Sequence, residues 1–94
     1  MERIYVKDVK GCEDSKILLK GLVHKIHGLG QVNFVQLIDK SGVIQLVADK
    51  EQIKDLRNES AIEVIGTKEI NDKAPNGIEI HVEEIRVVGR ASYD

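Results

Sequence analysis

An aromatic ring and a carboxamide occur where two neighbouring strands could bring them together. Phe34 lies in the alternating run Gln31–Ile38. Gln45 lies in a second alternating run, Val43–Ala48. An aromatic plane can stack on a nucleobase, and an amide beside it can hydrogen-bond the edge of that base. The two side-chain types therefore indicate recognition of an unpaired base rather than a chemical reaction.

A turn-forming stretch between the two runs predicts how they pair. The segment from Asp39 to Gly42 is rich in residues that favour tight turns, so we expect an antiparallel hairpin in which Ile38 pairs with Val43. Side chains alternate along a strand, and cross-strand partners share a face. The predicted outer face carries Phe34, Gln36, Ile38, Val43, Gln45 and Val47, and the predicted core face carries Val35, Leu37, Ile44 and Leu46.

The composition is that of one ordinary globular domain. The chain has 94 residues, of which 41% are hydrophobic and 32% are charged, and Phe34 is its one phenylalanine. The formal net charge is −2. A domain that binds nucleic acid without regard to sequence is expected to be clearly basic. The charge therefore disfavours that class, although it allows a local contact that recognises a few bases.

Several functional classes find no support in the residues. Cys12 is the one cysteine, which excludes an internal disulfide and suits a reducing cytoplasm. The three histidines, at positions 24, 27 and 81, lie on separate segments without cysteine partners, so we expect no metal site. The apolar runs are too short for a membrane span. We see no nucleophile–base pair and expect no catalytic site.

The hydrophobic pattern predicts five strands and one short helix. Asp49–Glu59 is the expected helix, because Asp49 and Gln52 can form a capping box. Tyr5–Asp14 should be a polar lead-in with one weak helical turn. Gly21 inside the first strand suggests a bulge or a sharp bend. The expected strands are Lys16–Ile26, Gln31–Ile38, Val43–Ala48, Ala61–Ile70 and Ile78–Val88.

Three strands, a helix and two further strands form the order of an OB-fold. We therefore predict an all-β, five-stranded Greek-key OB-fold barrel with the helix between the third and fourth strands, and an SH3-like barrel is the competing interpretation. The whole chain, 1–94, would be one domain with a core of about residues 16–91. In an OB-fold the second and third strands form the ligand face. Two turn-rich loops, His27–Gly30 and Asn71–Gly77, would flank it.

Four stretches of the chain resemble one known family in order and spacing. The longest, GLVHKIHGLGQVNFVQLIDKSGVIQLV at Gly21–Val47, is similar to the anticodon-binding domain of class II aspartyl-tRNA synthetases. Asparaginyl- and, more distantly, lysyl-tRNA synthetases share this domain. The supporting stretches are Leu56–Thr67, Lys73–Ile80 and Ile85–Ala91. The resemblance covers about Lys16 to Ala91.

The resemblance implies roles for individual residues. A strand-two phenylalanine that stacks on the central anticodon uridine matches Phe34, and a strand-three glutamine that hydrogen-bonds this uridine matches Gln45. Glu79 and the loop that contains Lys73 would approach neighbouring anticodon bases, with Lys73 as a donor to a base or phosphate. His27 stands where arginine is usual and could stack or donate there.

Some positions depart from the family pattern. Members usually carry an aromatic residue at Leu22, arginine at His27, an acid at Gly28 and arginine at Ile38. The loss of two guanidinium groups should weaken attraction to phosphate and bidentate contacts to bases.

The function implied is recognition of the tRNA anticodon loop by a domain of an aspartate–tRNA ligase, with no cofactor of its own. The resemblance places ATP and magnesium in a separate catalytic domain, and it implies a homodimeric, cytoplasmic parent enzyme. The chain stops at Asp94, where the family's hinge would begin, so we expect an excised domain. The alternatives are a subunit-interaction module that uses Leu22, Ile26 and Ile38, and a free-standing OB-fold that binds single-stranded nucleic acid.

Overall fold

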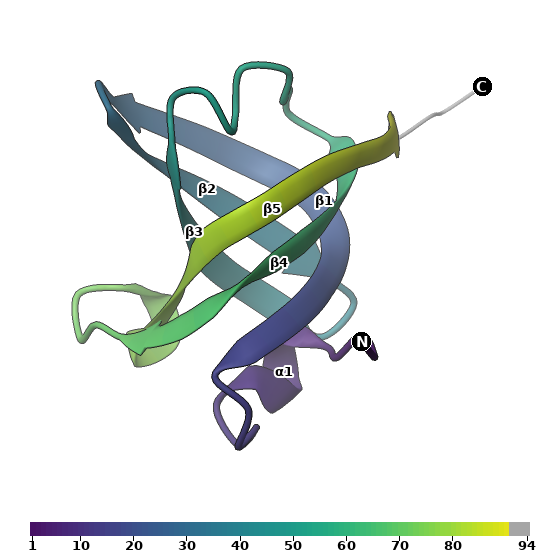
Figure 1. Ribbon diagram of the computed structural model, residues 1–94, viewed down its shortest axis with the longest axis vertical. Helices are drawn as coiled ribbons and strands as arrows, with labels where there is room; N and C mark the ends of the chain where they lie inside the picture. The colour runs from purple at the N-terminus through teal and green to yellow at the C-terminus, as the bar shows by residue number, and fades with distance from the viewer. Residues whose placement is uncertain (91–94) are drawn as a thin grey trace.

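The protein folds into a closed barrel of five strands in the computed structural model, which describes residues 1–90 (Figure 1). The strand order around the barrel is β1-β2-β3-β5-β4, and β4 pairs with β1 to close it. Among the strand pairs of residues 1–90, β3 with β5 is parallel and the other four pairs are antiparallel. This arrangement is the predicted all-β OB-fold barrel. The strands are β1 (Lys16–Leu29), β2 (Val32–Asp39), β3 (Gly42–Asp49), β4 (Ser60–Ile70) and β5 (Ile78–Arg90). The predicted end of the core, Ala91, lies outside the described residues.

The hairpin of β2 and β3 has the predicted register. Ile38 pairs with Val43, Gln36 with Gln45, and Phe34 with Val47. The side chains that were expected to face inward are all buried: Val35, Leu37, Ile44 and Leu46. The core is therefore aliphatic, as the scarcity of aromatic residues requires.

A single helical turn covers one end of the barrel. This turn is α1 (Val6–Val9), which lies at the lower end of the barrel in Figure 1. Val6 and Val9 are buried against the core, and Asp39 anchors the turn because its Oδ2 accepts a hydrogen bond from the Val6 backbone N–H at 2.8 Å. The weak turn predicted within Tyr5–Asp14 is confirmed. Among residues 1–90, no helix has the length and apolar character needed to cross a membrane.

The prediction of a helix at Asp49–Glu59, between β3 and β4, is wrong, because this segment forms successive turns. The capping box does form: Gln52 N donates to Asp49 Oδ1, and Asp49 N donates to Gln52 Oε1, both at 2.9 Å. A helix shorter than about 12–15 residues has little stability without tertiary support. Here Ile53 and Leu56 reach the core from a tight turn, in which Leu56 N donates to Ile53 O at 2.9 Å. The short helices lie elsewhere, at α1 and at the 3-10 turn η1 (Pro75–Gly77).

The first strand is longer than predicted, and its bulge lies elsewhere. β1 runs to Leu29, and its pairing with β2 shifts between Val23 and Lys25 rather than at Gly21. Gly21 instead marks a close approach of two strands, since a Cβ built there would lie 2.3 Å from the Ile38 carbonyl oxygen. Glycine is required at this position because the strands leave no room for a side chain.

Candidate nucleic-acid interface

Two rows of side chains point outward across the strands β1, β2, β3 and β5. Cross-strand partners share a face, so each row follows directly from the pairing of the strands. The Phe34 row consists of His27, Phe34, Val47 and His81. The Gln45 row consists of Lys25, Gln36, Gln45 and Glu79. The predicted ring and carboxamide therefore lie in adjacent rows on one face of the barrel.

The two rows enclose a hollow of about 220 Å³, which we name the polar hollow. The Phe34 side chain is half-buried on the outer face, in contrast to the fully buried Val35 and Leu37 of the same strand. Its ring can therefore receive a planar group from solvent. The residues that line the polar hollow are Lys25, His27, Phe34, Gln36 and Gln45.

Glu79 organises one side of this site as a buried acceptor. Its side chain is 11% exposed. The Oε1 atom accepts hydrogen bonds from Gln45 Nε2 at 3.1 Å and from Asn71 Nδ2 at 2.9 Å. The Oε2 atom lies 2.7 Å from His81 Nε2. Three side chains, from β3, from the loop that follows β4 and from β5, thus converge on one carboxylate.

The ionisation of Glu79 follows from these contacts. Burial raises the pKa of this carboxyl, but hydrogen bonds from His81, Asn71 and Gln45 outweigh burial and hold the pKa below its ordinary value. The carboxylate is therefore ionised at neutral pH and can only accept hydrogen bonds. It follows that His81 Nε2 carries a proton and that the amide groups of Gln45 and Asn71 face Glu79 with nitrogen.

The loop between β4 and β5 is tied to the edge of the same face. Asn76 Nδ2 donates to the Val43 carbonyl at 3.2 Å, and Asn71 reaches Glu79. Lys73 is exposed in this loop, and its backbone N–H donates to Asn71 Oδ1 at 3.0 Å. The side chain of Lys73 does not line the polar hollow. The loop flanks the outer face, as the sequence predicted, but Lys73 could contact a ligand only outside the polar hollow.

The structure adds residues that the sequence did not place in the site. Gln36 was predicted on the outer face, and its pairing with Gln45 brings it into the hollow. Lys25 enters because the bulge in β1 changes the phase of the strand, so that Lys25 and His27 point outward. His27 thus belongs to β1 and not to the predicted turn. His81 comes to the site through the parallel pairing of β3 with β5.

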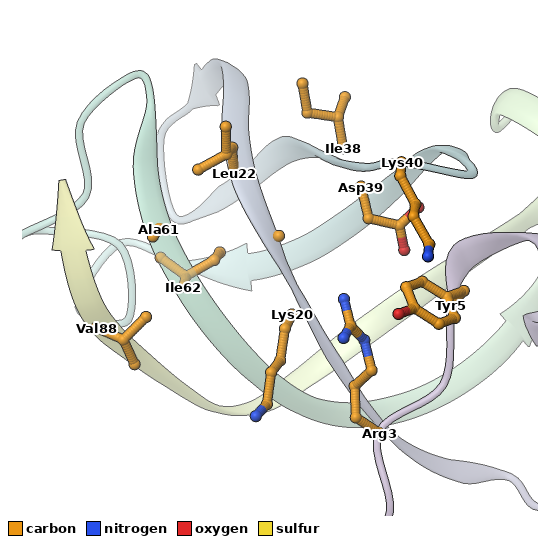
Figure 2. A pocket seen from close by; sticks show the side chains of 11 residues that line it. Arg3, Tyr5, Lys20, Leu22, Ile38, Asp39, Lys40, Ala61, Ile62 and Val88 are labelled. Atoms are coloured by element: carbon orange, nitrogen blue, oxygen red, sulfur yellow. The ribbon is translucent and has the colours of Figure 1, made fainter. Parts of the chain in front are cut away.

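A second hollow of about 450 Å³ lies on another part of the barrel, and we name it the apolar hollow (Figure 2). Leu22 and Ile38 pair across β1 and β2 and line it, so the arginine that the family carries at Ile38 would not lie in the polar hollow. At one end, Arg3 Cζ lies 4.1 Å and Lys40 Nζ 4.7 Å from the centre of the Tyr5 ring. Further lining residues are Lys20, Gly21, Asp39, Ala61, Ile62 and Val88.

The barrel topology and the outward ring and amides define the class of an OB-fold domain with a face suited to nucleic acid. The family model for the tRNA anticodon type, described as an OB-fold nucleic acid binding domain, matches residues 17–88. The chain belongs to this family, and the resemblance seen in the sequence is confirmed.

Several relatives of the chain are aspartate–tRNA(Asp/Asn) ligases. An aspartate–tRNA(Asp/Asn) ligase of Methanocaldococcus jannaschii is 40% identical over 96 residues, which cover 93% of this chain and 22% of that protein. The corresponding ligase of Archaeoglobus fulgidus is 36% identical over 98 residues, 95% of this chain and 23% of that protein. The chain thus spans less than a quarter of the length of these relatives.

A solved structure has the same barrel fold. The asparaginyl-tRNA synthetase of Pyrococcus horikoshii, in a complex with asparaginyl-adenylate, matches with a TM-score of 0.85 and 29% identity. The match covers 100% of this chain and 24% of that one. The barrel described here is therefore similar to one part of a larger synthetase.

Proposed function

We propose that this domain binds the anticodon loop of tRNA by capturing its central uridine in the polar hollow. The observation that carries the proposal is the placement of Phe34 and Gln45, which lie in adjacent rows and both line one hollow on the outer face. A base that leaves the loop stack could lie on the Phe34 ring, while Gln45 hydrogen-bonds its edge.

Basic residues near the hollow would attract the phosphates of the loop. Lys25 and His27 line the hollow, and Lys73 is exposed in the adjacent loop. Phosphate contacts position a nucleic acid but carry no sequence information. Because the net charge of the chain is −2, these local contacts must work without an attractive field from the whole domain. We therefore expect modest affinity for the isolated domain.

The parent protein is proposed to be an aspartate–tRNA ligase that acts in the cytoplasm and accepts both tRNA(Asp) and tRNA(Asn). The names of the archaeal relatives, which include both tRNAs, support this specificity. A central uridine is common to both anticodons, so Phe34 and Gln45 would serve for either one. ATP and magnesium would bind in the remainder of the parent protein, since the relatives are more than four times longer than this chain.

Binding to a short anticodon stem-loop tests the proposal. We expect the 94-residue chain to bind a stem-loop with a central uridine about tenfold more tightly than one with a central cytidine, because a good base-edge contact is worth about 1–3 kcal/mol. Fluorescence anisotropy at fixed, moderate salt gives both dissociation constants. Equal affinity for the two stem-loops, or no binding of either, would refute the proposal.

A second candidate function is contact with the other subunit of a dimeric parent, and the apolar hollow is the observation that favours it. Leu22 and Ile38, two of the residues expected to suit burial, both line this hollow. Val88 is 50% exposed at its edge. The third expected residue, Ile26, packs partly buried against the core and does not line this hollow. The occupant would be an apolar surface of the partner subunit.

Light scattering after size exclusion separates this candidate from the first. If the apolar hollow is a subunit contact, a chain extended to the full length of the relatives should be dimeric, and Leu22→Glu should shift it toward monomer. The same substitution should leave binding of the stem-loop unchanged. A Leu22→Glu protein that remains fully dimeric would exclude the hollow as the contact.

A further inference from the structure

We propose that Glu79 is a positioning residue that locks the orientation of the Gln45 carboxamide and thereby makes the polar hollow selective for uridine over cytidine. The inference rests on the proposed function and assigns to Glu79 a role that acts through another side chain. Its basis is one hydrogen bond, from Gln45 Nε2 to Glu79 Oε1 at 3.1 Å.

A free carboxamide discriminates poorly between these two bases. Uracil presents an N–H donor at N3 beside the O4 acceptor, whereas cytosine presents an N3 acceptor beside the N4 amino donor. A glutamine side chain carries both a donor and an acceptor, so rotation by 180° lets the same amide pair with either edge. Specificity requires that this rotation be prevented.

Glu79 prevents it because a carboxylate can only accept hydrogen bonds. If the Gln45 amide rotated, its oxygen would face the Glu79 oxygen and leave a nearly buried charge without one of its donors, which is costly. Asn71 and His81 hold the carboxylate in place from two other directions. Glu79 therefore cannot turn away to follow the rotated amide.

The fixed amide leaves an acceptor free for a ligand. Gln45 Oε1 makes no hydrogen bond among the described residues, and the one buried side-chain atom without a partner there is Arg3 Nε. The Gln45 oxygen is therefore accessible, and Gln45 lines the polar hollow. A fixed acceptor with one remaining Nε2 proton matches the N3–H and O4 of uracil, and it opposes the reversed edge of cytosine.

Glu79→Gln tests the inference, because an amide at position 79 can donate as well as accept and so permits both orientations of Gln45. The measured quantity is the ratio of dissociation constants for stem-loops with central cytidine and central uridine. Wild type should show a ratio of about ten, and Glu79→Gln should lower it to about one to three. Glu84→Gln, which removes an exposed carboxylate from the same strand, should keep the wild-type ratio.

The outcomes separate the inference from the proposed function. No uridine preference in wild type contradicts the function itself. A wild-type preference that Glu79→Gln retains, or that Glu84→Gln loses to the same extent, overturns the positioning role. If Glu79→Gln fails to fold, NMR relaxation of the wild-type Gln45 amide decides: an order parameter near the rigid backbone value of about 0.85 supports the lock, and a value below about 0.6 refutes it.

Discussion

Strands β1 and β2 contribute to both the polar hollow and the apolar hollow, yet the side chains that they place there differ in chemistry. In the polar hollow, β1 and β2 contribute Lys25 and Phe34. In the apolar hollow, the same strands contribute Leu22 and Ile38. The strand pairing is continuous between the two sites except for the bulge after Val23. The OB-fold thus supplies the frame, and the side chains at each end of the strands decide what each site can bind.

A carboxylate held by hydrogen bonds lies at each site, and the two serve different purposes: Asp39 lines the apolar hollow, and Glu79 contacts Gln45 beside the polar hollow. Asp39, at the apolar hollow, accepts from the backbone N–H groups of Val6, Ser41 and Gly42 and from the Ser41 hydroxyl. Its partners belong to its own turn and to α1, so it stabilises the scaffold. Glu79 instead binds side chains of the interface. Asp39 is thus a structural carboxylate, whereas Glu79 orients a binding group.

The largest effect is expected on the stability of the barrel, at Gly21 in β1, a strand that contributes to both hollows. Gly21→Ala should lower the free energy of unfolding by about 3 kcal/mol, because the new Cβ would collide with the Ile38 carbonyl and force the strands apart. Gly11→Ala is the matched control, since no atom lies within 4 Å of a Cβ there. Urea denaturation measures both. Similar stabilities of the two variants would contradict the close approach of β1 and β2 at Gly21.

Removal of the Phe34 ring, which lines the polar hollow, should weaken RNA binding, whereas a change in the apolar hollow should not. We expect Phe34→Ala to weaken binding of the uridine-centred stem-loop by about 1–3 kcal/mol, because one base loses its stacking partner. Leu22→Ala, in the apolar hollow, should leave this affinity unchanged. Isothermal titration calorimetry measures both variants. An unchanged affinity for Phe34→Ala would remove the basis for the stacking mechanism.

The two carboxylates predict an acid-sensitive stability. Burial raises the pKa of Asp39, but the Ser41 hydroxyl and three backbone N–H groups lower it below the ordinary value of 3.8; the pKa of Glu79 likewise lies below 4.5. A depressed pKa in the folded state gives stability that is present above the unfolded-state value and lost as pH falls through the folded-state value. The free energy of unfolding should therefore decline below about pH 4.5.

Two substitutions sharpen that prediction. Asp39→Asn and Glu79→Gln should each flatten the decline, and urea denaturation between pH 7 and pH 3 measures it. Only Glu79→Gln should also reduce the preference for uridine. A steep decline that neither variant alters would show that other groups cause it.

The smallest effect concerns the phosphates. Lys25→Gln should reduce the dependence of log affinity on log salt by about 0.7, the slope for one phosphate contact on a single strand. Lys20→Gln, at the apolar hollow, is the control and should leave the slope unchanged. Stem-loop titrations at several salt concentrations measure this quantity. Equal slopes for both variants would place the phosphates away from Lys25.

The sequence pattern predicted the hairpin of β2 and β3, because its pairing depends on residues that are close together in the chain. The alternation and turn residues around Phe34 and Gln45 were sufficient for the hairpin and its register, because a one-residue slip would expose the entire core face. The capping box at Asp49 also formed, but it could not reveal that turns would satisfy the segment without a helix. A cap specifies the start of a helix and does not supply the packing that extends it.

The remainder of the site depends on contacts that sequence patterns do not contain. The bulge after Val23 is marked only by the apolar Ile26, which is out of phase with the alternation of the preceding residues. His81 and Glu79 reach the interface through the parallel pairing of β3 and β5, strands far apart in the sequence. The family resemblance pointed to Glu79, but its contact with Gln45 is visible only in the structure.

The most direct test of the central claim is a map of the RNA contact by NMR. Titration of the labelled chain with the uridine-centred stem-loop should perturb the resonances of Phe34, the Gln45 side-chain amide and Glu79, and it should spare Leu22 and Ile38. Perturbations concentrated at Leu22 and Ile38, or the absence of any perturbation at Phe34 and Gln45 under saturation, would contradict the account.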